Sequence, residues 1–442
     1  MVSQRFFSSI GRTLLALSLL GCMGCSDEVR TDGPNEASQE DDTSDSQNRV
    51  DGGGEGEIPA ALIRVHYDVG FSNAIAIRGS GAGLSWAEGK EALWTEGNVW
   101  ELRLDVDDGS ESDILFKPTI QTADGQTLWA KGVDYRIRVG ETVTLVPTFY
   151  QSSGAVERFA MWSDDYGAER LIDVYLPPGY SEEGAAHRAY PIFFFLDGQN
   201  LFDEAAFFGG WQLDQTLDSL HAYGTVQTAE GVLTVSSIME AIIVAPHNSA
   251  NRIYEYTPSN GSFGDCDASV EQCGGGGEAH LQFLAGEVRA EVQARYRVTD
   301  DILGIGGSSL GGLLSLYACW VNPDIFPRCA AHSPSLWWDE GALLEEITED
   351  PEWMGASKIY LDVGTEEGMF EDVLLLERIF SESEAGELGA AEWTCIVGDG
   401  HGHQETAWRE RVPHALLFLL EDTGRVREEY SLPQGLSHCH EW

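Results

Sequence analysis

The chain has 442 residues, enough for two or three domains, and a hydrophobic fraction of 43% with 13 Trp is ample for a sizeable core. It carries 73 acidic against 26 basic residues, a formal net charge of -47. A surface this acidic repels nucleic acid and anionic lipid headgroups, so we expect no nucleic-acid partner and consider a polyanionic substrate unfavourable.

The first residues are typical of an export signal. A positively charged start precedes the apolar run Thr13–Leu20, which is too short to span a bilayer as a stable helix. The run ends in Leu-Leu-Gly-Cys at 19–22, which resembles the lipobox of bacterial lipoproteins. This resemblance implies removal of residues 1–21 and acylation of Cys22; Cys25 fits the pattern less well. An ordinary signal peptide is the alternative, and either one exports the protein, with membrane contact only through the lipid anchor.

The next two segments differ sharply in composition. Residues 22–57 are rich in Ser, Asp, Glu, Asn and Gly, cannot bury a core, and predict a disordered tether. Residues 58–148 contain short β-rich runs between Gly, Asp and Ser turns, which predict a small all-β sandwich. The clearest of these runs are 63–67, 74–78, 99–104 and 142–146.

Tryptophans mark one part of the predicted sandwich. The stretch 78–86, with Trp94 and Trp100 after it, resembles starch-binding-type carbohydrate-binding modules. The resemblance implies that exposed Trp rings stack on sugar faces and that the module binds polysaccharide. The alternative is that these Trp side chains belong to the core of an accessory sandwich.

From 149 to 442 the pattern alternates between strands and helices. We expect strands at 190–196, 241–245, 301–305, 358–363 and 393–397, and helices at 211–220, 281–296, 310–320, from about 371, and at 406–420. Repeated β–α units predict a doubly wound, mostly parallel sheet with helices on both faces. The long Gly-rich segment 248–277 is a candidate functional loop.

The strongest motif is Gly-Ser-Ser-Leu-Gly-Gly at 307–312. It contains Gly-x-Ser-x-Gly between a predicted strand and a predicted helix, the context of a nucleophile elbow. The helix N-terminus favours the anion that develops when a serine hydroxyl attacks. We therefore predict Ser309 as the nucleophile; the sequence around Ser308 matches less well, and a Gly-rich turn with a serine N-cap is the alternative.

A serine nucleophile needs a base and an acid that orients the base. His401 and His403 both lie between a predicted strand and the last predicted helix, and Glu366 and Glu367 follow an earlier strand. Hydrolases of this type have the chain order serine, acid, histidine. A His-x-His metal site is the alternative, but no convincing acidic partner motif accompanies the pair, so we expect no metal and no organic cofactor.

Residues from about 158 to 420 resemble the esterase family of α/β-hydrolases that includes enterobactin esterases, feruloyl esterases, esterase D (S-formylglutathione hydrolase) and mycolyltransferases. The matching stretches, in family order, are 196–202, 211–214, 251–258, 296–297, 307–312, 333–335, 363–365, and His403 five residues before Trp408. The resemblance implies that Ser309 is the nucleophile and His403 the general base. It favours Glu367 over Glu366 as the acid, although some members work with a Ser–His dyad.

The resemblance also implies an oxyanion hole built from the backbone N–H of Leu310 and one from the 197–199 loop, at Gly198 or Gln199. We expect Ser309 and His403 to lie within hydrogen-bond reach beside it. Four further side chains are candidates to line the substrate pocket: Trp211, His247, Arg252 and Trp337. Loop ordering is the alternative for His247, and core packing is the alternative for Trp337.

Six cysteines follow the export region, an even number that indicates disulfides in an oxidising compartment. We expect the pair Cys266–Cys273 around a short Gly-rich loop. Cys319–Cys329 and Cys395–Cys439 would then be the remaining pairs, although six cysteines allow fifteen connectivities.

Three functions are compatible with these features. The leading hypothesis is an exported serine esterase acting on carboxylic esters, including feruloyl or acetyl esters linked to polysaccharide. An enterobactin-type trilactone esterase or an acyltransferase is an alternative within the same fold. A catalytically inactive, carbohydrate-binding surface lipoprotein is an alternative of another class.

Overall fold

The computed structural model describes residues 60–105, 113–151, 153–206, 209–223, 225–228, 231–234, 238–262, 273–349, 357–382, 391–421 and 432–442. The expected signal segment, Cys22 and the expected tether lie outside these ranges. Among the helices of the described ranges, none combines the length and the apolarity that crossing a bilayer requires.

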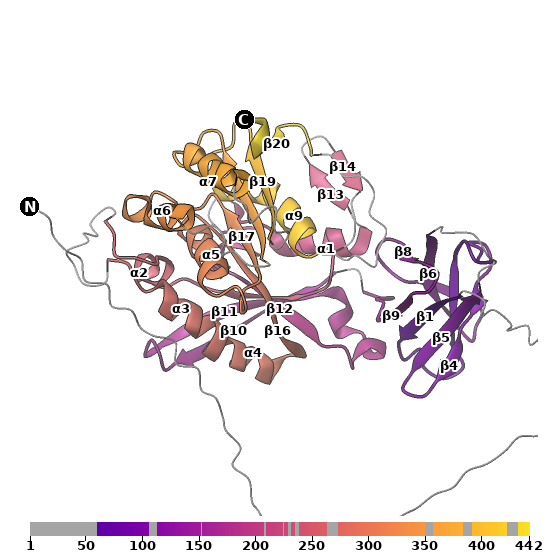
Figure 1. Ribbon diagram of the computed structural model, residues 1–442. Coiled ribbons are helices and arrows are strands. Elements are labelled where there is room, and N and C mark those ends of the chain that lie inside the picture. The colour runs from indigo at the N-terminus through magenta and orange to yellow at the C-terminus, as the bar shows by residue number, and fades with distance from the viewer. Residues whose placement is uncertain are drawn as a thin grey trace, which may run out of the picture. The chain divides into compact units, whose positions relative to one another are not determined.

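The predicted β-sandwich is confirmed in the first part of the chain (Figure 1). Its strands are β1 (Ala60–His66), β2 (Ala74–Ser80), β3 (Lys90–Glu91), β4 (Leu93–Thr95), β5 (Val99–Asp105), β6 (Ile114–Gln121), β7 (Thr127–Trp129), β8 (Tyr135–Ile137) and β9 (Thr142–Leu145). One sheet has the order β4-β5-β1-β9; the other has the order β3-β2-β6-β7, with β8 paired to β6. Alternate side chains of β1, such as Ile63 and Val65, are fully buried in the core that the two sheets share.

A nine-stranded sheet follows in the order β10-β11-β15-β12-β16-β17-β18-β19-β20. The strands from β15 to β19 are parallel to one another, and β10, β11 and β20 are antiparallel additions at the edges. The bounds are β10 (Ala155–Ser163), β11 (Ala168–Leu176), β12 (Tyr190–Phe195), β15 (Ile242–Pro246), β16 (Val298–Ser308), β17 (Arg328–His332), β18 (Lys358–Gly364), β19 (Glu392–Gly398) and β20 (Leu436–His438). A small hairpin, β13 (Thr225–Thr228) with β14 (Gly231–Thr234), stands apart from this sheet.

Helices cover both faces of the large sheet. They are α1 (Leu213–Tyr223), α2 (Arg252–Tyr256), α3 (Gly277–Phe283), α4 (Arg289–Arg295), α5 (Leu310–Val321), α6 (Ala342–Glu349), α7 (Phe370–Glu382) and α9 (Glu405–Leu419). In β12, Phe193 and Phe195 pack with α1 and α9, whereas Phe194 packs in the core that α4, α5, α6 and α7 cover. Both faces of the strand are therefore buried, which explains its continuous apolar sequence and confirms the doubly wound α/β-hydrolase fold.

Several elements differ from the sequence-based expectation; among them, α2, α6, β13, β14 and β20 were not predicted. The edge hairpin β10–β11 and the strand β17 were not predicted, and β17 is only five residues long. The predicted helix at 281–296 begins earlier, at Gly277, and contains a π-helical turn over Leu284–Val288 between α3 and α4.

The Glu182 carboxylate joins the sandwich to the following part of the chain. It accepts hydrogen bonds from the backbone N–H groups of Phe149, Tyr150 and Gln151, the last two at 2.7 and 2.8 Å. The Tyr67 hydroxyl, from the segment after β1, donates to its other oxygen at 2.7 Å. Ala185, three residues along the chain, is buried in the sandwich core.

The disulfide predictions have different outcomes. The Cys395–Cys439 bond is confirmed and ties β19 to the C-terminal segment. The Cys319–Cys329 bond is wrong, because both are buried thiols and Cys319 Sγ instead donates to the Phe326 carbonyl at 3.1 Å. Cys273 is disulfide-bonded, and Cys266, its expected partner, lies outside the described residues.

Candidate active site

The turn at Ser309 has the backbone of a nucleophile elbow. β16 ends at Ser308, α5 begins at Leu310, and Ser309 between them has φ 59° and ψ −121°. A positive φ is costly for a residue with a Cβ and persists only where the surrounding structure enforces it. A Cβ on Gly312 would lie 2.7 Å from the His332 carbonyl oxygen, so the close packing of this turn requires glycine.

Ser309 lies against the segment that follows β17. Its backbone N–H donates to His332 O at 3.0 Å, and Ser335 N donates back to Ser309 O at 3.1 Å. The Ser309 and Ser335 hydroxyl oxygens are 3.3 Å apart. The Ser309 side chain is only half-buried, so a substrate can reach its hydroxyl.

His403 and Glu367 form the second part of the site. His403 Nδ1 lies 2.7 Å from Glu367 Oε2; the Glu367 side chain is fully buried, whereas that of His403 is 36% exposed. The ring of Trp408 packs edge-on against the His403 ring, with centroids 5.0 Å apart. A carboxylate that accepts from Nδ1 leaves Nε2 of the neutral imidazole as a proton acceptor, the state a general base needs.

These groups meet because parallel strands end at one edge of the sheet. Ser309 follows β16, Glu367 follows β18 and His403 follows β19, and β17 joins β16 to β18. Within the described residues, no hydrogen bond joins the Ser309 hydroxyl to His403, since the hydroxyl faces Ser335. The expected contact is therefore not formed in this state; such bonds are often long or misaligned before substrate binds.

The loop expected to supply the oxyanion hole is tightly held. Asp197 adopts the left-handed conformation with φ 60°, and a Cβ on Gly198 would lie 2.2 Å from Ala245 O. Arg252 binds both oxygens of Asp197, at 2.9 and 2.7 Å, and its Nη2 also lies 3.5 Å from Ser308 O. Arg252 thus joins the loop of Gly198 and Gln199 to the elbow of Leu310, the two predicted sources of oxyanion donors.

The predicted pocket residues take different positions. Trp211 does not line a pocket: it is 2% exposed and packs on Trp408, because its side chain completes the core under α1 and α9. His247 Nε2 is bound to Asp173 at 2.9 Å, as expected for a loop-ordering residue. Trp337 is 36% exposed and Arg252 is engaged with Asp197.

His401 also differs from His403 in its surroundings. Its Nδ1 lies 3.2 Å from Arg411 Nη1, and its side chain is 15% exposed. Burial and the Arg411 charge lower the pKa of His401. His401 therefore packs against α9 and does not face the Glu367 carboxylate.

A buried polar network under the site was missed by sequence reasoning. Arg411 is fully buried and lies 3.1 Å from Asp362 and 3.3 Å from Glu367. His332 Nδ1 lies 2.5 Å from Asp362. Burial alone would raise the pKa of Asp362, but the charges of Arg411 and His332 lower it well below its usual range. The neighbouring positive charge of Arg411 favours the ionised form of the buried Asp362 carboxylate.

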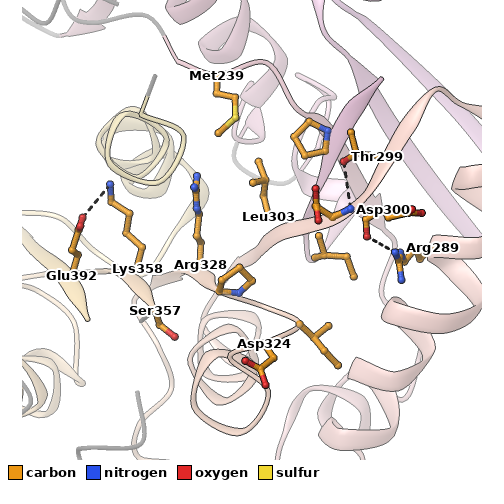
Figure 2. Close-up of a pocket in the computed structure, with 15 residues that line it drawn as sticks. Met239, Arg289, Thr299, Asp300, Leu303, Asp324, Arg328, Ser357, Lys358 and Glu392 are labelled. Carbon is orange, nitrogen blue, oxygen red and sulfur yellow. Dashed lines mark hydrogen bonds and ion pairs between the residues drawn. The ribbon is translucent and has the colours of Figure 1, made fainter. Parts of the chain in front are cut away.

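Other candidate sites in the described residues would be a metal-binding cluster or a second pocket. The described ranges contain no group of three or more His, Cys, Asp or Glu side chains arranged to hold a metal ion. A pocket of about 790 Å³ lies at the opposite edge of the sheet, where β16, β17 and β18 begin. Figure 2 shows the residues that line it. Its Lys358 is paired with Glu392, and Arg289 donates to Asp300, so these cations are engaged within the protein.

Comparison with known proteins shows which family the chain matches. The model of the family described as "Putative esterase" matches residues 163–419, more than half of the chain. The siderophore triacetylfusarinine C esterase of Aspergillus fumigatus is 29% identical over 187 residues, 41% of this chain and 57% of that protein. The siderophore enterobactin esterase of Emericella nidulans is 27% identical over 202 residues, 44% of this chain and 63% of that protein. The chain thus covers less than two thirds of the length of these two esterases.

Among solved structures, an IroE-like serine hydrolase from Shewanella oneidensis is 22% identical to this chain, with a TM-score of 0.46. The match covers 60% of this chain and 80% of that one.

Proposed function

This chain belongs to that esterase family, and on this premise we propose that it hydrolyses carboxylic esters through an acyl-enzyme intermediate, with Ser309, His403 and Glu367 as the catalytic triad. The observation that carries the proposal is the strained Ser309 elbow at the same sheet edge as a histidine already paired with a buried carboxylate. Such strain and such pairing concentrate at functional sites.

In the acylation step, Ser309 Oγ forms a bond to the ester carbonyl carbon while its proton moves to His403 Nε2. The negative charge on the carbonyl oxygen is stabilised by the N–H of Leu310 and an N–H of the 198–199 backbone; each such donor contributes about 3 to 4 kcal/mol. The ester C–O bond then breaks, and His403 returns the proton to the leaving alcohol.

Deacylation repeats these steps with water. His403 takes a proton from the water as its oxygen attacks the acyl carbon, and the acyl–oxygen bond to Ser309 breaks as Oγ regains a proton. Throughout, the Glu367 carboxylate stabilises the positive charge of the transient imidazolium.

The test is turnover of p-nitrophenyl acetate by the wild type and by Ser309→Ala, together with covalent labelling by a fluorophosphonate. We expect Ser309→Ala to lose both turnover and label. Ser163→Ala is a matched control, because Ser163 is a buried serine on the edge strand β10 whose hydroxyl donates to Glu287. Turnover that survives in Ser309→Ala would refute the nucleophile assignment.

For the substrate we propose an ester linked to polysaccharide, such as a feruloyl or acetyl ester, because the sandwich displays aromatic rings to solvent. Trp86 is 37% exposed and Trp129 is 40% exposed. Arg78 connects them: its Nη1 donates to Trp86 O at 3.1 Å, and its guanidinium lies 5.2 Å from the centre of the Trp129 ring. Trp94 is also exposed, whereas Trp100 is buried in the core.

This part of the proposal is tested by pull-down on insoluble polysaccharide. Loss of retention in Trp86→Ala with Trp129→Ala, at unchanged p-nitrophenyl acetate turnover, would support binding through the sandwich. Retention without fluorophosphonate labelling of the wild type would instead favour the inactive carbohydrate-binding lipoprotein.

A siderophore ester is the second candidate, favoured by the names of the two fungal relatives. The net charge of -47 opposes an anionic ferric siderophore, so the polysaccharide ester is preferred. Product analysis with enterobactin and with methyl ferulate distinguishes the two.

Export and anchoring through Cys22 complete the proposal. Metabolic labelling with a fatty acid, in cells that express the wild type or Cys22→Ser, tests it: label in the wild type alone supports a lipid anchor.

A further inference from the structure

We infer that Ser333 is a positioning residue for the proposed triad, because its hydroxyl fixes the rotation of the Glu367 carboxylate behind His403. Ser333 is the first residue after β17, is fully buried, and has a left-handed backbone with φ 44°. This inference rests on the proposed esterase function. The roles proposed for Ser309, His403 and Glu367 do not themselves require a hydroxyl group at position 333.

The hydrogen bonds of the Ser333 hydroxyl determine where its proton points. Trp408 Nε1 donates to Ser333 Oγ at 2.9 Å, and Arg411 Nη2 donates to it at 2.9 Å. Both lone pairs of the oxygen are thereby used, because indole and guanidinium nitrogens can only donate. The single hydroxyl proton must then point to the remaining neighbour, Glu367 Oε1, which lies 2.8 Å away.

The two oxygens of Glu367 consequently have separate roles. Oε1 accepts from Ser333 Oγ, from Gly364 N at 2.8 Å and from Arg411 Nη2 at 3.3 Å. Oε2 accepts from His403 Nδ1 at 2.7 Å, the one donor to this oxygen in the described part of the chain. Three donors on one oxygen lock the carboxylate plane and leave the other oxygen directed at the imidazole.

Ser333 also constrains the aromatic partner of the base. The indole that donates to Ser333 packs edge-on against His403 at 86°. The backbone of Ser333 is fixed in turn, since its N–H donates to Asp362 O at 2.9 Å and approaches the Asp362 carboxylate at 3.2 Å. The Ser333 side chain therefore fixes the positions of both Glu367 and the Trp408 ring, which contact His403. A shift of about 1 Å in a catalytic group can lower the rate by about 10²-fold.

The experiment compares Ser333→Ala and Ser333→Gly with the wild type, Ser309→Ala and Ser163→Ala, using p-nitrophenyl acetate across the pH range. Rates are expressed per active site counted by fluorophosphonate titration, so that misfolded protein does not contribute. Glycine suits the φ of 44° without strain, so Ser333→Gly removes the hydroxyl while favouring the native backbone.

We expect both Ser333 variants to lower kcat per active site by about tenfold to a hundredfold, with KM within about twofold of wild type. The acid limb of kcat/KM should move to lower pH, because a loosened Glu367 stabilises the protonated imidazole less well. Glu405, a second carboxylate that interacts with His403, is unchanged in every variant. Ser163→Ala should match the wild type in rate and pH profile.

Two results would overturn the inference while leaving the esterase intact: wild-type kcat and acid limb in both Ser333 variants, or fewer active sites with normal kcat per site. The second result would mean that Ser333 only stabilises the fold. Failure of the proposed function itself is distinct, because the wild type would then show no turnover or Ser309→Ala would retain it.

Discussion

Replacing Glu367 with glutamine should disable the base without removing its hydrogen-bond partner. Three donors, from Ser333, Gly364 and Arg411, converge on Oε1, so the amide oxygen of a glutamine must take that position. The amide NH₂ would then face His403 Nδ1, which must become an acceptor, leaving its proton on Nε2. An imidazole in this tautomer cannot accept the Ser309 proton.

The expected loss in Glu367→Gln follows from this tautomer change. When a triad acid is replaced by its amide, kcat typically falls by about 10⁴-fold, and at 1.36 kcal/mol per tenfold a loss of 10³- to 10⁴-fold is about 4 to 5 kcal/mol. The assay is kcat with p-nitrophenyl acetate at the pH optimum, per active site titrated with a fluorophosphonate. KM should change little, because Glu367 is fully buried and has no access to substrate.

Glu366→Gln is the matched control, since it makes the same substitution on the neighbouring, exposed side chain. It should retain wild-type kcat. A loss below tenfold in Glu367→Gln would refute the reasoning and would indicate that the enzyme works with a Ser–His dyad.

Three further predictions concern the oxyanion loop, the disulfide and acid stability. Arg252→Ala should lower kcat by about tenfold to a hundredfold at nearly constant KM, because the 197–199 loop loses the ion pair between Arg252 and Asp197. Arg252→Lys should not restore the rate, since lysine cannot bind both carboxylate oxygens. Replacing Cys395 and Cys439 with serine should lower the free energy of unfolding in urea by about 4 kcal/mol, the chain-entropy value for a separation of 44 residues; no change in the urea midpoint would contradict it. Burial lowers the pKa of His280 to about 4 and of His414 to about 3, so the unfolded chain binds more protons below about pH 6.5. These two histidines should therefore contribute their full stabilisation above that pH, and the free energy of unfolding should fall on acidification towards pH 4. A free energy of unfolding that does not change with pH would contradict the burial argument.

The parts of the fold that the sequence predicted have local signals. The elbow at 307–312 combines glycine spacing with a strand before it and a helix after it, and β12 is a continuous apolar run. Short motifs at strand ends left His401 and His403, and Glu366 and Glu367, as alternatives, and the resemblance to the esterase family favoured His403 and Glu367. Each of these patterns is contained within a few residues, so one segment of sequence suffices to show it.

The missed features depend on residues that are distant in sequence. The strand β17 is five residues long and has no alternation, so only its pairing with β16 and β18 identifies it. The role of Ser333 depends on the positions of Trp408 and Arg411, which lie more than seventy residues further along the chain. The Cys319–Cys329 prediction was wrong for a similar reason, since the spacing of two cysteines does not say where their thiols point.

The Glu182 carboxylate has a consequence for how the protein can be divided. Its three backbone donors lie at 149–151, where sequence composition places the boundary between the sandwich and the hydrolase fold. A cut at this boundary would keep these donors with Glu182 but would remove the Tyr67 hydroxyl from its 4% exposed carboxylate, and the loss of a hydrogen bond to a buried polar group is destabilising. The hydrogen bond between Tyr67 and Glu182 therefore links the stability of the sandwich to that of the segment that follows it, so separate expression of either region should lower its stability.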